Sequence, residues 1–419
     1  MIVFQQKLTK VQVDTVGTAV GMAFFQLTNF LLGIFIVRML GGTELGNYQY
    51  FIATTTLLSY FAKMGFDEKL SYILPTIGGA NSEQGNKLIS NTLLQTLIYS
   101  CVILFFYCVF LVFFSSGNDS NTLLVEVFAY VLYFPSFVGG LILLSVLRAE
   151  NKMLQRSFFV YLVPNIINFI FIVTLVFFAS ISNIAPLARA LSYFFIFIVL
   201  LFLIYSHYGL KLPEKLKFEK PKEFNWLFLT SLCFIVESGV LAIWLGKSYL
   251  VDSEFGVLAV LLRLSALVLL IPVAISLVLG PLLAKNPLNQ NIRNKMLKTN
   301  FCGVLLVLIF ICFFAKYLLI FFGQEYVGSE WQLLKLSFAM GVLAWSQPIN
   351  SIFIAFKKYH YIIFAALVSL TAFLGVISYE DNINLSSLLT ALILSIMVFS
   401  FIKLLLLKVL FIKSNNLND

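Results

Sequence analysis

The segment His207-Tyr-Gly-Leu-Lys-Leu-Pro-Glu-Lys-Leu-Lys-Phe-Glu-Lys-Pro-Lys-Glu-Phe224 lies almost at the midpoint of the 419-residue chain. It contains five of the lysines and is the longest polar break in a sequence that is otherwise mostly apolar. Six apolar segments come before it and six follow it. We therefore predict two lobes of six helices each, at 1–206 and 225–419, joined by a basic linker at 207–224.

The composition indicates that the solvent of this chain is a lipid bilayer. Hydrophobic residues make up 60% of the sequence and charged residues only 11%. A water-soluble protein of this length cannot hide so much apolar surface. The net charge of +9 comes from lysines and arginines spread over short loops, which is typical of membrane topology rather than nucleic-acid binding. The five cysteines fall inside apolar segments, so we expect free thiols, with no metal site and no cofactor.

A helix needs roughly 20 apolar residues to cross the hydrocarbon core. On this measure the sequence predicts twelve transmembrane helices, because lipid offers the backbone of an open chain no other way to satisfy its polar groups. The predicted spans are 15–40, 47–66, 87–114, 122–147, 156–180, 185–206, 225–247, 255–280, 299–322, 331–356, 359–379 and 385–412. Prolines at positions 135, 164, 272 and 348 fall inside spans and are expected to kink them.

The positive charges predict the orientation. Most lysines and arginines lie in the N-terminus, in the loops after the even-numbered spans and in the C-terminus. Since cytoplasmic loops are enriched in these residues, both termini are expected to face the cytoplasm. In a bacterium this would make the chain a multi-pass protein of the inner membrane.

A short internal repeat supports two related halves. Glu44-Leu-Gly46 follows the first span and Glu254-Phe-Gly256 follows the seventh, at a shift of 210 residues. Because six spans return the chain to the same side, such halves are parallel repeats about an axis along the membrane normal. Repeats of this kind are typical of transporters, which place a central cavity at the repeat interface and alternate access by rocking one half.

Two motifs resemble a known family. Arg38-x-Leu-Gly followed by Glu44-x-Gly-x-Tyr48 is similar to the opening of bacterial polysaccharide flippases, and Phe322-Gly-x-x-Tyr326 resembles a turn of the same group. By length, span count and loop placement the whole chain resembles O-antigen flippases (Wzx type) of the multidrug/oligosaccharidyl-lipid/polysaccharide exporter superfamily. Spans 13 and 14 of the lipid II flippases are missing, which argues against a peptidoglycan substrate.

The resemblance implies an all-α transporter rather than an enzyme. Its substrate would be an undecaprenyl-pyrophosphate-linked oligosaccharide, moved from the inner to the outer leaflet through a cationic cavity between two helix bundles. It also implies a polysaccharide polymerase and a chain-length regulator as partners. We expect a monomer.

Charged residues within the spans are the candidate transport residues, because a charge at bilayer depth usually faces a cavity or a partner. Glu237 in span 7 and Arg263 in span 8 are expected either to form a structural ion pair or to act separately. In the second case, Arg263 contacts phosphate or acidic sugars and Glu237 couples a proton.

Five other cations are candidates for substrate binding, although each has a simpler explanation in reaching for the lipid headgroups. Arg38 gains weight because it matches the arginine of the resembled family. The others lie near the ends of their spans: Lys63, Arg189, Lys316 and Lys335.

Other functions remain open, among them an exporter of another lipid-linked sugar in the same superfamily. A multidrug exporter of the same superfamily usually relies on an acidic residue in the first half, whereas the first-half spans here carry mainly arginine and lysine. A membrane-embedded O-antigen polymerase would be an enzyme with a sizeable outer loop, whereas the longest predicted outer loop is only Ser115 to Thr122.

Overall fold

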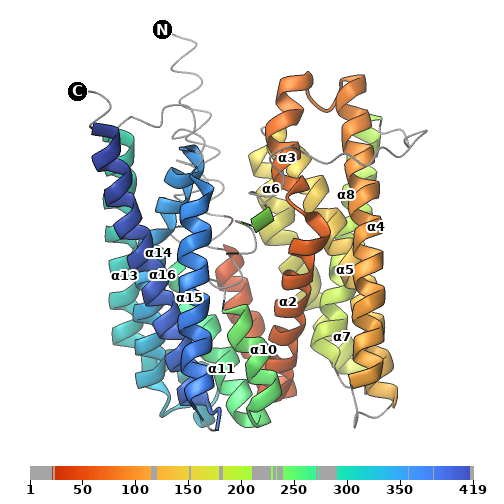
Figure 1. Cartoon of the computed structure of the whole chain (residues 1–419). Coiled ribbons are helices and arrows are strands. Elements are labelled where there is room, and N and C mark those ends of the chain that lie inside the picture. The colour runs from red at the N-terminus through yellow and green to blue at the C-terminus, as the bar shows by residue number, and fades with distance from the viewer. Residues whose placement is uncertain are drawn as a thin grey trace. The chain divides into compact units, whose positions relative to one another are not determined.

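The computed structural model is helical throughout the part of the chain that it describes, and no strand occurs there (Figure 1). The predicted all-α membrane protein is therefore confirmed. The described residues are 21, 24–114, 120–150, 152–178, 183–209, 228–229, 233, 239–269, 272, 290–356, 358–380 and 382–415.

The chain folds as two compact units. Unit 1 comprises residues 1–32 and 50–228, and unit 2 comprises residues 33–49 and 229–419. The sequence did not predict that residues 33–49 group with the C-terminal half. Most of the predicted linker at 207–224 lies outside the described residues, so that assignment stays a prediction.

Unit 1 contains long helices that match the predicted spans. Their apolar runs exceed the length needed to cross a bilayer, which is why they form uninterrupted helices. The elements are the first part of the helix Phe24–Leu40, most of α2 (Gly42–Lys63), α3 (Phe66–Ile73), η1 (Leu74–Ile77), α4 (Glu83–Phe114), α5 (Ser120–Ala149), α6 (Met153–Ser157), η2 (Phe158–Leu162), α7 (Val163–Phe178) and α8 (Ile184–Tyr208). The short α3 and η1 fall in a segment that we expected to be a loop.

One predicted helix distortion is visible at Pro164. The five residues Phe158–Leu162 form a π-helical turn directly before α7, and Pro164 is the second residue of α7. Proline has no N–H to donate to the preceding turn, so the regular α-helical pattern of hydrogen bonds cannot continue through it. By contrast, Pro135 and Pro348 lie inside helices that run on without a change of type.

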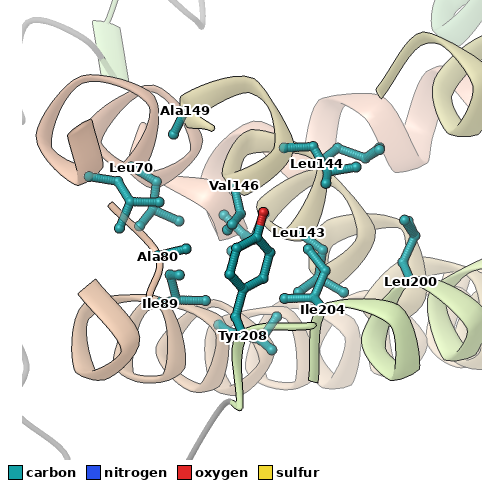
Figure 2. Packing of buried hydrophobic residues seen from close by; sticks show 14 of the residues in the cluster. Leu70, Ala80, Ile89, Leu143, Leu144, Val146, Ala149, Leu200, Ile204 and Tyr208 are labelled. Carbon is teal, nitrogen blue, oxygen red and sulfur yellow. The ribbon is translucent and has the colours of Figure 1, made fainter. Parts of the chain in front are cut away.

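The core of unit 1 forms where α3, α4, α5 and α8 meet. Leu143 on α5 and Ile204 on α8 are fully enclosed, and Tyr208 closes the cluster at the end of α8 (Figure 2). Asn86 on α4 donates a hydrogen bond to the carbonyl oxygen of Tyr208, at 2.8 Å, and so satisfies one of the last carbonyl groups of that helix. These contacts fix α8, which carries one of the candidate site residues.

Unit 2 is built in the same way from long apolar helices. Its described elements are α10 (Val240–Tyr249), α11 (Asp252–Ser265), η3 (Ala266–Leu269), α13 (Gln290–Phe322), η4 (Gln324–Tyr326), α14 (Glu330–Ala355), α15 (Tyr359–Tyr379) and α16 (Leu385–Asn415). Helix α16 packs against α14 and α15 and also contacts α10 and α11. Helix α16 is therefore the common packing partner of these four helices.

Seven helices in the described part are long and apolar enough to cross a membrane. A further apolar helix, Phe24–Leu40, is shorter. The bounds of the long helices agree with the predicted spans to within a few residues at most ends. The predicted orientation, the symmetry of the halves and the central cavity stay predictions.

Candidate substrate-binding residues

Arg189 is enclosed within unit 1. It is only 6% exposed and lies close to the start of α8. Its Nη1 donates a hydrogen bond to Oδ1 of Asn165 on α7 at 3.3 Å, and its Nη2 donates to the hydroxyl of Tyr193 at 3.0 Å. The guanidinium carbon also lies 4.5 Å from the centre of the Tyr193 ring. The enclosure of Arg189 argues against the alternative in which it reaches the lipid headgroups, and its contact with substrate stays a prediction.

Asn165 extends this contact to a third helix. Its amide group donates hydrogen bonds to the hydroxyl of Thr28 at 2.9 Å and to the carbonyl oxygen of Phe25 at 3.2 Å. The side-chain oxygen of Asn165 faces the cation and its amide protons face acceptors, so the hydrogen bonds agree in polarity. The result is a buried polar chain from Thr28 through Asn165 and Arg189 to Tyr193, which we call the Arg189 network.

Lys403 is a second buried cation, and it belongs to unit 2. Its side chain is fully enclosed, with 0% exposure, in the second half of α16. The ammonium nitrogen lies 4.1 Å from the centre of the Phe399 ring, one turn earlier on the same helix. The sequence analysis did not select Lys403, because it was counted among the basic residues near the C-terminus. The sequence did contain an indication of its burial, because Lys403 lies inside the apolar run of the last predicted span.

Buried polar side chains occur on the helices around this part of α16. The hydroxyls of Ser346 on α14 and Ser400 on α16 are 3.2 Å apart and both are fully enclosed. Asn300 on α13 donates to the carbonyl oxygens of Ala344 at 2.9 Å and Trp345 at 3.3 Å. Uncharged hydrogen-bonding groups therefore occur on α14 near Ser346 and on α16 at Ser400, three residues before Lys403.

Arg263 is half-buried in unit 2, near the end of α11. A Cβ atom at Gly33 would lie only 2.8 Å from Nε of Arg263, so the glycine makes room for the guanidinium group. The guanidinium carbon lies 5.9 Å from the centre of the Tyr48 ring. Glu237, the predicted partner of Arg263, lies outside the described residues, so both roles predicted for it stay predictions.

The two family-like motifs meet at one end of unit 2. Arg38 donates hydrogen bonds to the carbonyl oxygens of Ile320 at 2.8 Å and Phe321 at 3.2 Å, which are among the last carbonyls of α13. A cation at a helix C-terminus stabilises it through these carbonyls. This contact gives Arg38 a structural role, and its contact with substrate stays a prediction.

Glycines allow the close packing of this cluster. The phenol oxygen of Tyr326 occupies the space that a side chain at Gly42 would need, and a Cβ at Gly256 would lie 3.0 Å from the backbone of Gly42. Burial raises the pKa of the Tyr326 phenol, and the neighbouring Glu325 raises it further. The repeated Glu-x-Gly segments after spans 1 and 7 are therefore brought together, which the sequence did not show.

The remaining predicted cations have different surroundings within their own units. Lys63 forms an ion pair of 3.0 Å with Asp67 in unit 1. Lys316 and Lys335 are exposed side chains of unit 2, and the ammonium of Lys335 lies 5.6 Å from the centre of the Trp331 ring. Exposed cations beside aromatic rings on apolar helices are typical of anchoring at the membrane surface.

The sign of the buried charge is the same in both units. Among the described residues, the charged side chains that are buried are Arg189 in unit 1 and Lys403 in unit 2. No aspartate or glutamate whose side chain the structure describes is buried to the same degree. Within the described part of the chain, no group of three His, Cys, Asp or Glu side chains is placed to hold a metal ion.

Solved transporter structures share this fold over almost the whole chain. The MATE multidrug transporter DinF-BH, solved in complex with a small molecule, superposes with a TM-score of 0.69 at 17% identity and covers 96% of this chain and 95% of its own. A MATE multidrug resistance transporter of the MOP superfamily, in an outward-facing conformation, gives 0.68 at 17% identity, with 94% of each chain covered.

A third similar structure is a MOP superfamily transporter from Pyrococcus furiosus Vc1, described as having a binding pocket of reverse polarity. It gives a TM-score of 0.62 at 15% identity, with 94% of each chain covered. No protein-family model matches this sequence, and no curated protein matches it. The chain is thus an all-α, multi-pass membrane protein with the fold of transporters that have twelve transmembrane helices in two bundles.

Proposed function

We propose that this protein translocates a polyprenyl-pyrophosphate-linked oligosaccharide across a bacterial inner membrane. The observation that carries the proposal is the positive sign of the buried charge, supplied by Arg189 in unit 1 and Lys403 in unit 2. A transporter that encloses cations favours an anionic substrate, because the electrostatic energy of a charge inside protein is much larger than in water. The fold supports the more general function of membrane transport.

Arg189 is the residue to which we assign the phosphate contact. A guanidinium group presents several N–H donors in a plane that suits phosphate oxygens, and it stays charged at every physiological pH. The Arg189 network uses Nη1 and Nη2 of this group to hold its orientation. We assign secondary electrostatic roles to Arg263 and Lys63, while Arg38, Lys316 and Lys335 act at the ends of their helices.

An oligosaccharide is also suited to the uncharged polar groups of the interior. Stripping a hydroxyl of water without a new hydrogen bond costs roughly 2–7 kcal/mol, so a sugar headgroup does not cross hydrocarbon unaided. Buried Asn, Ser and Thr side chains, such as Asn168, Thr96 and Asn350, show that the interior of each unit already holds uncharged hydrogen-bonding groups. The lipid tail would remain in the bilayer while the headgroup moves.

The second candidate function is multidrug export. It is favoured by the similar structures, two of which are described as multidrug transporters. A protein that exports cationic drugs needs an acidic residue at its binding site, and the buried charges described here have the opposite sign. The two functions therefore differ in the charge of the substrate.

A reconstitution experiment separates these functions. Purified protein in vesicles would be given a fluorescent polyprenyl-pyrophosphate disaccharide in one leaflet or a cationic rhodamine dye in the lumen. We expect the lipid-linked sugar to reach the other leaflet faster than in protein-free vesicles, and Arg189→Gln to remove the difference. Export of the cationic dye without movement of the lipid-linked sugar would support the multidrug function instead.

In a bacterial host, deletion gives an independent test. Loss of surface polysaccharide, with single lipid-linked repeat units accumulating on the cytoplasmic side, is the expected result. Accumulation on the outer leaflet would instead indicate the polymerase, which we propose as a partner together with a chain-length regulator. We propose that the protein acts as a monomer with both termini in the cytoplasm.

A further inference from the structure

We propose that Lys403 is the site at which this transporter exchanges a proton during its cycle. The inference rests on the transport function proposed above and adds the coupling reaction. Lys403 is completely enclosed by unit 2, although an ammonium group is strongly hydrated in water. A buried ionisable residue within a membrane helix marks a transport pathway or a proton relay more often than a packing position.

The chemistry of the two buried cations separates their roles. Arg189 carries a guanidinium group, which does not release a proton in proteins, whereas the amine of Lys403 does so readily when its surroundings change. Arg189 therefore supplies a permanent charge. Of the two, only Lys403 can change its charge state in the proposed cycle.

The enclosure of Lys403 also restricts what can bind there. With 0% exposure, its Nζ atom has no open surface against which a sugar or a phosphate can lie. A metal cation is excluded whenever the ammonium is charged. A proton needs only a chain of hydrogen-bonding groups. The Ser346 and Ser400 hydroxyls, 3.2 Å apart, form one link of such a chain, and Ser400 precedes Lys403 by three residues on α16.

The alignment of α15 with α16 shows which ionisable residues of α15 lie at the level of Lys403. Ser369 on α15 donates to the carbonyl oxygen of Ser395 at 2.7 Å, and α15 and α16 run antiparallel through a short connection. Eight residues further along α16 lies Lys403, and eight residues back along α15 lies Tyr361. Tyr361 is half-buried against Phe353, with ring centres 5.4 Å apart, and Tyr359 and His360 precede it directly on α15.

The other helices packed against α16 also carry charged and ionisable residues. On α14, Ser346 stands opposite Ser400, and Lys335 precedes it by a stretch of helix about 16 Å long. The titratable and charged groups of the elements packed against α16 are Tyr359, His360, Tyr361 and Tyr379 on α15, Glu330 and Lys335 on α14, Lys247 and Tyr249 on α10, and Asp252, Glu254 and Arg263 on α11. His360, the histidine among them, is exposed.

The proposed step is a simple proton exchange. In one state of the cycle an N–H bond of the Lys403 ammonium breaks, its electron pair stays on Nζ, and the proton passes to water. In the other state Nζ takes a proton from water on the opposite side of the membrane. The transmembrane proton gradient supplies the free energy, and the positive charge of unit 2 alternates as the substrate moves.

The first test needs no substrate. Hydrogen–deuterium exchange of α14 and α16 peptides would be measured in the full-length protein at several pH values and corrected for the intrinsic exchange rate. We expect protection in wild type to change with pH, and this change to be lost in both Lys403→Gln and Lys403→Arg. His360→Gln and Lys408→Gln, which alters an exposed lysine of the same helix, should keep the wild-type response.

The second test measures coupling. Vesicles containing the protein and the polyprenyl-pyrophosphate disaccharide would be assayed with and without a pH gradient, and the ratio of the two flipping rates compared. We expect a ratio above one for wild type and Lys408→Gln, falling to one for Lys403→Gln. A pH response that survives in Lys403→Gln in both experiments would overturn the proposal. If wild type does not flip the lipid-linked sugar, the proposed transport function is overturned. The hydrogen–deuterium exchange measurement then still decides the role of Lys403.

Discussion

Arg189 in unit 1 and Lys403 in unit 2 are both cations enclosed by protein, but their surroundings differ. Arg189 donates charged hydrogen bonds to Asn165 and Tyr193, and Asn165 in turn holds Thr28 on another helix. The ammonium of Lys403 lies 4.1 Å from the centre of the Phe399 ring, one turn earlier on the same helix. A guanidinium group presents its donors in a rigid plane, whereas an ammonium group is a compact charge at the end of a flexible side chain. This difference accords with the separate roles that we propose for the two buried cations.

The largest effect that tests this comparison is on transport. Arg189→Gln removes a permanent charge and its charged hydrogen bonds, which are worth about 1.5–3 kcal/mol each. If the same contacts stabilise the bound pyrophosphate, we expect the flipping rate to fall about 10- to 100-fold, measured with the lipid-linked disaccharide in vesicles. The loss should be independent of the pH gradient, unlike that of Lys403→Gln.

Arg189→Lys serves as the matched variant. It keeps the charge but cannot reach Asn165 and Tyr193 with separate nitrogens, so its activity should lie between wild type and Arg189→Gln. If Arg189→Gln flips the substrate at the wild-type rate, the charge of unit 1 is structural and the comparison between the units fails.

The next effect is on the stability of unit 1. Asn165→Ala removes the hydrogen bonds to Phe25 and Thr28 and leaves one nitrogen of Arg189 without its acceptor. We expect the free energy of unfolding in detergent–lipid micelles to fall by about 1–3 kcal/mol, because a buried polar group loses its partner. Thermal unfolding followed by circular dichroism would measure it.

Thr174→Ala on the same helix is the control for Asn165→Ala. The Thr174 side chain is exposed, and its hydroxyl donates only to the carbonyl oxygen of Ile170 within α7. Its effect should be close to zero. Equal effects of the two substitutions would mean that the Arg189 network adds nothing to the packing of unit 1.

These contacts show what the sequence reveals and what it does not. The long helices were predicted because each apolar run has to satisfy its backbone within the bilayer, which fixes both type and length. Arg189 was selected as a charge in a span, but Asn165 precedes it by 24 residues, and no pattern in the sequence joins them. The contact depends on how α7 and α8 pack after the π-helical turn at Phe158–Leu162.

Lys403 and the motif cluster of unit 2 show the same limit. Lys403 was counted with the basic residues of the C-terminus, since charge and position alone do not separate a buried lysine from one that reaches the membrane surface. The repeated glycines Gly46 and Gly256 were recognised, but not that Gly256 packs on the backbone of Gly42. Close backbone approach depends on tertiary packing, which a single sequence does not contain.

A smaller effect is expected where neutral hydrogen bonds surround Lys403. Ser346→Ala removes the contact between the Ser346 and Ser400 hydroxyls. Hydrogen bonds between helices of a membrane protein average about 0.6 kcal/mol, so the free energy of unfolding should fall by about that amount. Ser378→Ala, at an exposed position of α15 whose hydroxyl bonds only within its own helix, is the control. A loss as large as that of Asn165→Ala would show that unit 2 is held as rigidly as unit 1.

The smallest effects are expected at the exposed cations of unit 2. Lys316 and Lys335 have exposed side chains on α13 and α14, so replacing either with glutamine should change the free energy of unfolding by less than about 0.5 kcal/mol. We expect the flipping rate of the lipid-linked disaccharide to stay at the wild-type value, because surface charges are screened by salt within about 10 Å. A strong loss of flipping in Lys335→Gln would place a substrate contact at the end of α14. The positive charge that matters for transport would then not be confined to the two enclosed cations, and the contrast between Arg189 and Lys403 would describe only part of the pathway.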